Sequence, residues 1–252
     1  MCILFIAIEQ HPKYPLIIAA NRDEFYHRPT AVSNYWAEYP NVLAGRDLHS
    51  GGSWMGINEQ GYIAALTNFR DPMLNQLEAP SRGLLVVDYL KRPIKNYHEK
   101  LNYDAARYNG YNLLYGHWHQ LSVYNNVSKQ YKQLSSGIYG LSNAMLDTPW
   151  PKLSHGAEQF KQALSKANNV LDDSLFSVLS DQTVAPDEAL PDTGIGRERE
   201  RVLSSIFINS EGYGTRSSTI LRVSCTKKVT WVERTFSSQG GSESEQHYSF
   251  YL

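Results

Sequence analysis

Two apolar runs separated by a polar turn at the start of the chain constrain the fold most. Residues 2–8 and 15–20 are apolar and rich in β-branched side chains, whereas residues 9–14 are polar and include a proline. Two short runs around such a turn predict an antiparallel hairpin. Directly opposed residues in a hairpin lie about 4.5–5.5 Å apart at Cα, so this pairing brings distant residues together.

The register of this hairpin decides what faces Cys2. If residues 9–14 form the turn with opposed residue numbers summing to 23, Cys2 lies opposite Asn21. A slip of one residue would put Ala20 or Arg22 there instead.

Cys2 is a candidate nucleophile. Methionine is normally removed before a small residue, which would leave Cys2 with both a thiol and a free α-amino group. Their ordinary pKa values are about 8.5 and about 7.7–8.0, so the amine can act as general base for the thiol near neutral pH. The alternative is that Cys2 is a small apolar residue on a buried strand.

The polar segment after the second run contains the candidate partners of the thiol. Arg22 can favour the thiolate, and Asp23 can orient the α-ammonium group by hydrogen bonding. The alternative is a solvated turn that closes an apolar strand. Asn68 and Asn143 are candidate oxyanion donors, since each follows a predicted strand and a small hydroxylated residue. Asparagine at a strand end is also common in ordinary turns.

Composition excludes several classes of protein. The chain has 252 residues, 42% hydrophobic and 19% charged, so it can build a core without disulfides. A net charge of −1 gives no electrostatic reason to expect binding to nucleic acid or an anionic membrane. With no evident linker or repeat, residues 1–252 are predicted to form a single domain.

The cysteine count and the apolar runs indicate the compartment. Cys2 and Cys225 are the two cysteines; a bridge between them is possible on paper but would block the nucleophile. The first apolar run is too short for a membrane span and lacks the layout of a signal peptide. We therefore predict a cytoplasmic protein without stable membrane insertion. No metal site is predicted, because His117 and His119 have no third ligand nearby.

The order of predicted elements indicates an α+β fold. Strands are followed by helices and then by strands again, which predicts two antiparallel sheets face to face between helical layers, a four-layer αββα sandwich. The charge-alternating residues 197–201 are typical of a solvated helix face, and residues 237–246 of a mobile loop. The predicted strands are 2–8, 15–21, 54–57, 62–68, 111–116, 119–125, 130–134, 215–224, 228–236 and 247–252, and the predicted helices begin near 81, 96, 153 and 173.

Several short blocks occur in a fixed order along the chain: 1–3 (MCI), 20–26 (ANRDEFY), 28–29 (RP), 44–48 (AGRDL), 51–58 (GGSWMGIN), 66–70 (LTNFR), 140–143 (GLSN) and 213–219 (YGTRSST). Together they resemble the NRDE family, also called the transport and Golgi organisation protein 2 family. The family is in turn similar to cysteine N-terminal nucleophile hydrolases such as bile salt hydrolase. The resemblance implies the same αββα sandwich, here called Ntn-hydrolase-like.

The resemblance also implies roles for single residues. Asn68 and Asn143 match the two hydrolase asparagines near the N-terminal residue, and Asp23 matches the aspartate that holds the amine and the thiol. Arg216 resembles a late arginine beside the thiol; the alternative is a strand arginine paired with a surface carboxylate. Asn21 is expected to contact the substrate. The chain departs from the hydrolases in having Ala20 where they have an arginine, with Arg22 in the middle position instead.

Two functions remain open at this stage. The residues favour a cysteine amidohydrolase acting on linear amides or thioesters of small acyl compounds, which requires no cofactor. The family resemblance implies an alternative, a non-catalytic protein that carries haem or an acyl lipid, with a His, Tyr or Cys2 as axial ligand. The predicted partner is therefore a small acyl compound or haem, and the sequence does not predict an oligomeric state.

Overall fold

A computed structural model describes residues 2–166 and 170–252, and for Cys2 it describes the backbone alone. The described residues form two seven-stranded sheets in which every pairing is antiparallel. The first sheet has the order β10 (Gly137–Leu141), β1 (Cys2–Ile8), β2 (Leu16–Phe25), β12 (Tyr213–Val223), β13 (Lys228–Phe236) and β14 (Ser242–Tyr251), with β11 (Asn209–Ser210) paired to β12. The second has the order β3 (Thr30–Trp36), β4 (Tyr39–Asp47), β5 (Met55–Asn58), β6 (Tyr62–Asn68), β7 (Tyr111–His117), β8 (Gln120–Asn125) and β9 (Gln130–Gln133).

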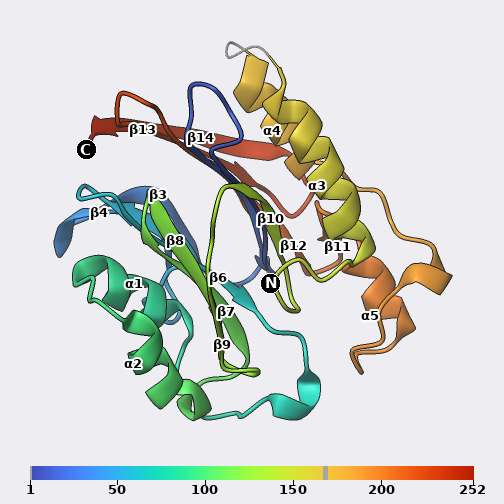
Figure 1. Ribbon diagram of the computed structural model, residues 1–252. Helices are drawn as coiled ribbons and strands as arrows, with labels where there is room; N and C mark the ends of the chain where they lie inside the picture. The colour runs from blue at the N-terminus through green and yellow to red at the C-terminus, as the bar shows by residue number, and fades with distance from the viewer. Residues whose placement is uncertain (1, 167–169) are drawn as a thin grey trace.

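Helices cover the outer face of each sheet (Figure 1). Helices α1 (Gly83–Lys91) and α2 (Tyr97–Tyr103) pack on the second sheet, and α3 (Pro151–Leu164) and α4 (Leu171–Leu179) pack on the first. The short α5 (Arg197–Val202) and the 3-10 turns Pro72–Leu74, Ala105–Arg107 and Asp187–Ala189 lie in the connections. The predicted α+β class and αββα layer order are confirmed.

Strand β1 explains why the layers stack in this order. Leu4 and Ile6 pack into the core between the sheets, and Ile3 and Phe5 pack under α3 and α4. Because successive side chains of a strand point to opposite faces, an apolar run without alternation must be covered on both sides. Strand β1 accordingly lies inside its sheet, between β10 and β2.

The hairpin of β1 and β2 forms in the other register. Cys2 pairs with Arg22, not with Asn21, and Ile3 pairs with Asn21. The turn decides this, because the backbone N–H of Glu9 donates to the carbonyl oxygen of Pro15 at 2.8 Å, with Glu9 in the left-handed region at φ 56°. The prediction that Cys2 faces Asn21 is wrong by one residue.

A Cys2–Cys225 bridge is excluded by the same sheet. Strand β2 pairs with β12 from Arg22 opposite Ser217 to Leu16 opposite Val223, so the two cysteines belong to opposite ends of the paired region. Six strand residues span roughly 20 Å. A disulfide needs Cα atoms about 4.4–6.8 Å apart.

Other elements differ from the predictions. Strands β3, β4 and β10 were not predicted, and β14 begins at Ser242, inside the predicted mobile loop, because its backbone pairs with β13 over its whole length. The predicted helix over residues 197–201 is present as α5, but its solvated face includes one buried residue, Glu200. No helix in the described part of the chain has the length and apolar character to cross a membrane.

Candidate functional site

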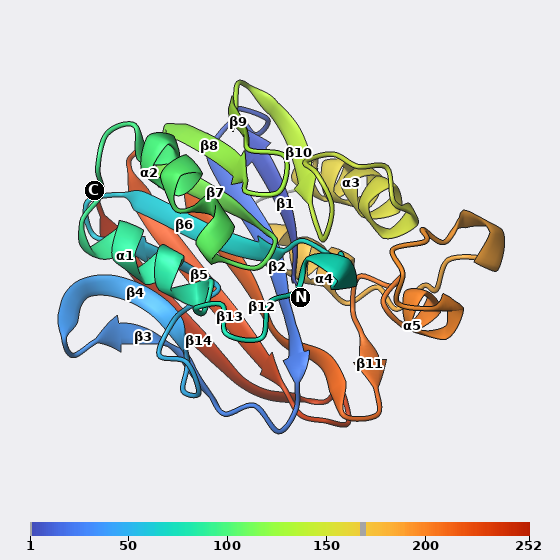
Figure 2. The same ribbon diagram turned by 90° about the horizontal axis from the view of Figure 1, so that it is seen from below.

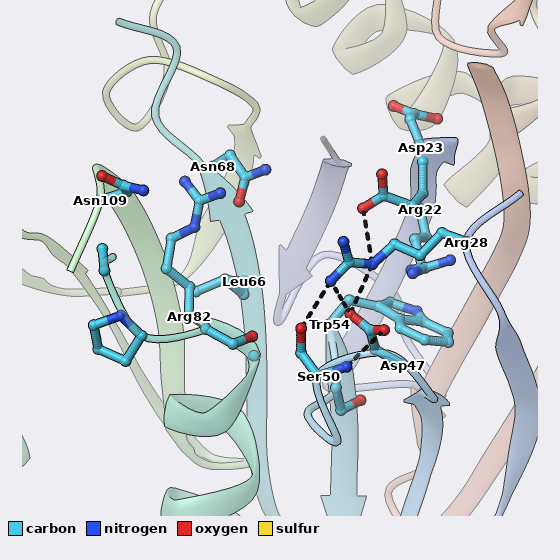
Figure 3. A pocket seen from close by; sticks show the side chains of 16 residues that line it. Arg22, Asp23, Arg28, Asp47, Ser50, Trp54, Leu66, Asn68, Arg82 and Asn109 are labelled. Carbon is cyan, nitrogen blue, oxygen red and sulfur yellow. Dashed lines mark hydrogen bonds and ion pairs between the residues drawn. The ribbon is translucent and has the colours of Figure 1, made fainter. Parts of the chain in front are cut away.

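A polar cavity of about 250 Å³ opens at the end of β2 and β6 (Figure 3). One wall comes from β2 and from the segment that joins β4 to β5, and the opposite wall from β6 and the start of α1. Strand β1 contacts both β2 of its own sheet and β6 of the other, and Figure 2 shows β2 and β6 near the start of the chain. Its lining includes Arg22, Asp23, Glu24, Arg28, Asp47, Ser50, Ser53, Trp54, Leu66, Asn68, Ala79, Pro80, Ser81, Arg82, Gly83 and Asn109.

Arg22 forms the base of the first wall. Its guanidinium stacks on Trp54, with Cζ 4.3 Å from the ring centroid, and Nη1 donates to the Thr30 hydroxyl at 3.0 Å. The residue is 5% exposed. A buried, stacked guanidinium is always charged, so Arg22 provides a fixed positive charge opposite the Cys2 backbone position.

Arg28 and Asp47 form the rim of the same wall. Arg28 donates to Asp47 Oδ2 from Nε at 3.0 Å and from Nη2 at 2.7 Å, and to Ser50 Oγ at 3.0 Å. Burial opposes ionisation of Asp47, but the Arg28 hydrogen bonds and charge outweigh it and lower the pKa of Asp47. Figure 3 shows this pair beside Trp54, facing Asn68 and Arg82 across the opening.

Asp23 lies deeper, at 1% exposure. Its Oδ1 accepts a hydrogen bond from Thr215 Oγ1 at 2.7 Å, and Thr215 Oγ1 in turn accepts from the backbone N–H of Ile208 at 2.9 Å. Burial raises the pKa of Asp23, opposed by the charges of Lys152 and Arg22 and by the Thr215 hydrogen bond. A carboxylate held in this way favours a cation next to it.

Asn68 and Asn143 come together from different sheets. Asn68 ends β6 and its half-buried side chain lines the cavity. Asn143, after β10, is 1% exposed, and its Nδ2 donates to the Asn68 carbonyl oxygen at 2.9 Å. The two asparagines, predicted to converge on one pocket, are neighbours, but Asn68 lines the cavity and Asn143 is not among the residues that line it.

The Asn21 side chain stabilises the packing of the sheet against the segments that cover it. Its Nδ2 donates to the carbonyl oxygens of Leu179 and Ile206, at 2.8 and 3.0 Å, and its Oδ1 accepts from Ser218 Oγ at 2.5 Å. Both amide hydrogens are thus used on the helix-covered side of the sheet. Because these bonds occupy the amide, the structure gives no support to the predicted contact between Asn21 and a substrate.

Arg216 holds the chain that follows β2. It sits at a bulge in β12 between Thr215 and Ser217, and its Nη1 donates to the carbonyl oxygens of Phe25, Tyr26 and Arg28 at 3.0–3.1 Å. Its side chain lines a second cavity of about 70 Å³, which shares Trp54 with the first. Arg216 is not among the residues that line the polar cavity next to Asn68.

The predicted removal of Met1 and the position of the Cys2 thiol lie outside the described residues. The backbone of Cys2 is described, and it places the first position of β1 opposite Arg22. Within the described part of the chain, no three His, Cys, Asp or Glu side chains gather as a metal site requires.

Several residues of the site were missed in the sequence. Arg28, Asp47 and Trp54 stand inside blocks that carried the family resemblance, so position within those blocks was a usable signal. Arg82 stands in none of them; its Nη1 donates to the Gly110 carbonyl oxygen at 2.8 Å and its side chain lines the cavity. No pattern in the sequence connects Arg82 with Asn68.

The family profile described as Transport and Golgi organisation 2 matches residues 1–238. The chain belongs to this family. The family resemblance drawn from the sequence blocks is thus confirmed. A human Transport and Golgi organization protein 2 homolog is 36% identical over 100% of this chain and 99% of its own length. The Drosophila melanogaster Transport and Golgi organization protein 2 is 30% identical over 93% of this chain and 92% of its own.

The solved structures that resemble this chain do so only remotely. A mutant of the conjugated bile acid hydrolase of Clostridium perfringens aligns over 100% of this chain and 92% of its own, with 9% identity and a TM-score of 0.47. The Caenorhabditis elegans ortholog of N-acylethanolamine-hydrolyzing acid amidase aligns over 87% and 92%, with 11% identity and a TM-score of 0.40. Likenesses at this level carry no argument about function.

Proposed function

We propose that this chain hydrolyses a linear amide or thioester of a small acyl compound, with the thiol of Cys2 as nucleophile after Met1 is removed. One observation supports this most: β1 begins opposite Arg22, at the end of β2 where Asp23 and Asn68 line one cavity. A nucleophile, a fixed cation, a carboxylate and an amide donor are the groups that thiol acyl transfer needs.

The reaction would proceed in two steps. The α-amine of Cys2 takes the thiol proton, the sulfur attacks the carbonyl carbon, and the carbonyl oxygen becomes an oxyanion that accepts hydrogen bonds from amide N–H groups. The C–N or C–S bond to the leaving group then breaks, and the leaving group takes the proton from the α-ammonium. Water next attacks the acyl thioester, giving a carboxylic acid and the free thiol.

The described residues have distinct parts in this scheme. Asp23 would hold the α-ammonium, since its buried carboxylate is stabilised by a nearby positive charge. Arg22 would favour the thiolate, and Asn68 would donate to the oxyanion. A cavity of about 250 Å³ fits a small substrate, because sites for drug-sized ligands are commonly about 300–1,000 Å³. In a reducing cytoplasm the thiol would remain free.

A mass measurement combined with one substitution tests the proposal. Cys225 is exposed and would react with the same reagents, so Cys225→Ser serves as the reference protein. In that background we expect an intact mass lacking Met1, a burst of product, and an acyl adduct on Cys2 with amide or thioester substrates. Cys2→Ala should abolish turnover while substrate binding persists, because the nucleophile acts in the chemical step.

Three results would contradict the proposal. One is a full-length mass as the dominant species, since the blocked amine cannot act as base. Another is a reference protein that is inert toward a broad panel of amides and thioesters. The third is equal turnover by Cys2→Ala and the reference protein, which would show that another group carries the chemistry.

Carriage of haem or of an acyl lipid is the second candidate, and the cavity gives it less support. Among the described residues that line the cavity, none is His, Tyr, Met or Cys, the usual axial ligands of haem iron. The lining instead consists largely of charged and amide side chains. Titration with haemin tests this candidate: stoichiometric binding that survives Cys2→Ala, in a protein without hydrolase activity, would favour it.

A further inference from the structure

A buried ion pair lies behind the two asparagines. Arg70 Nη1 is 2.6 Å from Glu200 Oε2, and the two side chains are 5% and 2% exposed. The other carboxylate oxygen of Glu200 accepts hydrogen bonds from the backbone N–H and the hydroxyl of Thr193, at 2.9 and 2.5 Å. Trp150 covers the guanidinium, with its ring centroid 4.9 Å from Arg70 Cζ. Both charges are therefore enclosed and held in one geometry.

Stability alone gives little reason for this pair. Taking two charges out of water is costly, and replacing a buried ion pair by apolar residues often leaves stability unchanged or improves it. Glu200 is the buried residue of α5, so a charged side chain anchors this helix where an apolar one would serve. The orientation that the pair imposes on its neighbours is the better explanation.

The neighbour that it orients is Asn143. The Arg70 backbone N–H donates to the Asn143 carbonyl oxygen at 2.7 Å, and Arg70 Nη2 donates to Asn143 Oδ1 at 3.4 Å. Ser142 Oγ donates to the same Oδ1 at 3.3 Å. A guanidinium can donate but not accept, so the oxygen end of the Asn143 amide must face Arg70 and its NH₂ end must face away.

The NH₂ end then points toward the end of β6. Asn143 Nδ2 donates one hydrogen to the Asn68 carbonyl oxygen at 2.9 Å, which fixes the residue whose own amide lines the cavity. The second hydrogen of Nδ2 has no acceptor among the described residues. A reversed Asn143 amide would put two acceptors against each other at Asn68 and remove this donor.

We propose that Arg70 and Glu200 are positioning residues of the site: Glu200 fixes Arg70, and Arg70 sets the orientation of the Asn143 amide and the place of Asn68. This inference rests on the proposed function, in which the Asn68 amide donates to the oxyanion. Neither charged residue lines the cavity, so both act through the asparagines.

Kinetics in a matched set of variants test the proposal. Glu200→Gln keeps the size of the side chain but removes its charge and one of its two acceptor oxygens, and Arg70→Met/Glu200→Gln avoids an unpaired buried charge. The control is Arg201→Met, on the same helix as Glu200, which breaks the exposed pair of Arg201 with Asp187 of the 3-10 turn Asp187–Ala189. We expect kcat to fall about 10- to 100-fold in the first two with KM within about twofold, because oxyanion donors act in the chemical step. The control should match wild type.

A second substitution separates positioning from general destabilisation. In an Asn143→Ala background, Glu200→Gln should have little further effect on kcat, because the group that it positions is gone. An equal fall of kcat in both backgrounds would overturn the proposal, as would full kcat in Glu200→Gln. A purely structural pair would change the midpoint of unfolding but not kcat of the folded enzyme.

A spectroscopic measurement keeps this inference separate from the proposed function. Side-chain NH₂ resonances of Asn68 and Asn143 can be assigned in ¹⁵N spectra by their loss in Asn68→Ala and Asn143→Ala. Glu200→Gln should shift the Asn143 pair, and Arg201→Met should not. If wild type proves inactive, a shift would still support positioning while the hydrolase proposal fails. Unchanged Asn143 resonances in Glu200→Gln would overturn the positioning role whatever the activity.

Discussion

Asn68 and Asn143 occupy similar places after a strand, but their amides have different surroundings. The Asn68 side chain is half-buried at the cavity and has no hydrogen bond to any described residue. The Asn143 side chain is buried and bonded at both ends, to Arg70 and to the Asn68 carbonyl oxygen. Asn68 is therefore available to a ligand, whereas Asn143 also contributes to the structure.

Replacing each asparagine by alanine should give different results. For Asn68→Ala we expect kcat to fall about 10²–10³-fold, as for loss of an oxyanion donor, with a stability change within about 0.5 kcal/mol. Asn143→Ala should also lower the free energy of unfolding by about 1–3 kcal/mol, because it leaves buried partners unpaired. Steady-state kinetics and urea unfolding check both. Comparable destabilisation by the two variants would contradict this assignment.

Glu233 should make stability depend on pH. Its side chain is fully buried between the sheets, and its Oε1 accepts a hydrogen bond from the Ser33 backbone N–H at 2.6 Å. Burial raises the pKa of Glu233, although this hydrogen bond and the nearby charge of Arg22 oppose the increase. An acid with a raised pKa in the folded state binds more protons folded than unfolded. Stability is therefore lost as pH rises from the ordinary carboxyl pKa through the raised one, by at most about 1.4 kcal/mol per pH unit.

Glu233→Gln tests this sign, since it keeps an acceptor for Ser33 without a titrating group. We expect the variant to gain stability over wild type as pH rises from 5 to 8, measured by urea unfolding at several pH values. A difference between the two proteins that is constant with pH would show that Glu233 has an ordinary pKa.

The sequence predicted Asp23 and Asn68 at the cavity, because each closes an apolar strand whose partners were evident. It did not predict Arg70 with Glu200. A charge-alternating helix is usually solvated, and nothing local connects two residues 130 positions apart. The one-residue error in the hairpin has a similar cause, because the left-handed conformation of Glu9 is set by the turn and not by the apolar pattern.

At the scale of elements, the strands with continuous apolar runs were predictable, and so was the exposed edge strand β9, but β3, β10 and the start of β14 were not. Strand β3 pairs with β4 through two register shifts and has a mixed burial pattern, so no period of two is visible. Strand β10 is short and contains two glycines. Strand β14 pairs on one side only, and its Ser- and Glu-rich start has the composition of a loop.

The contact of Gly52 with Gly83 joins two elements of the cavity wall. A Cβ on Gly52 would lie 2.5 Å from the backbone carbon of Gly83, at the start of α1. Since backbone cannot rotate away, Gly52→Ala should shift α1 from the segment before β5, destabilise by about 1–3 kcal/mol and reduce activity. Gly241→Ala, with its nearest contact at 3.7 Å, is the control. Thermal unfolding and kinetics check this, and a variant like wild type in both would contradict it.

At the scale of the whole molecule, the layer order followed from the order of elements, but the strand neighbours did not. The N-terminal β2 pairs with β1 on one side and with β12, near the other end of the chain, on the second. The alternation of apolar residues gives the faces of a strand but not its neighbours. Which strand lies beside β2 is decided by the packing of both sheets together.

The position of β2 between β1 and β12 has a consequence for biosynthesis. At about 5–20 residues per second, the ribosome delivers β12 roughly 10–40 s after the first hairpin. Until then the edge of β2 that pairs with β12 is unpaired, and non-local pairings of this kind form slowly. We expect nascent chains stalled before β12 to remain sensitive to protease in β1 and β2, and chains stalled well beyond residue 223 to become resistant. Protection of the hairpin before β12 is made would contradict this, because it would show that the hairpin is stable alone. If the expectation holds, the first strands to be synthesised are among the last to complete their pairing. Chaperones can bind these strands during that interval.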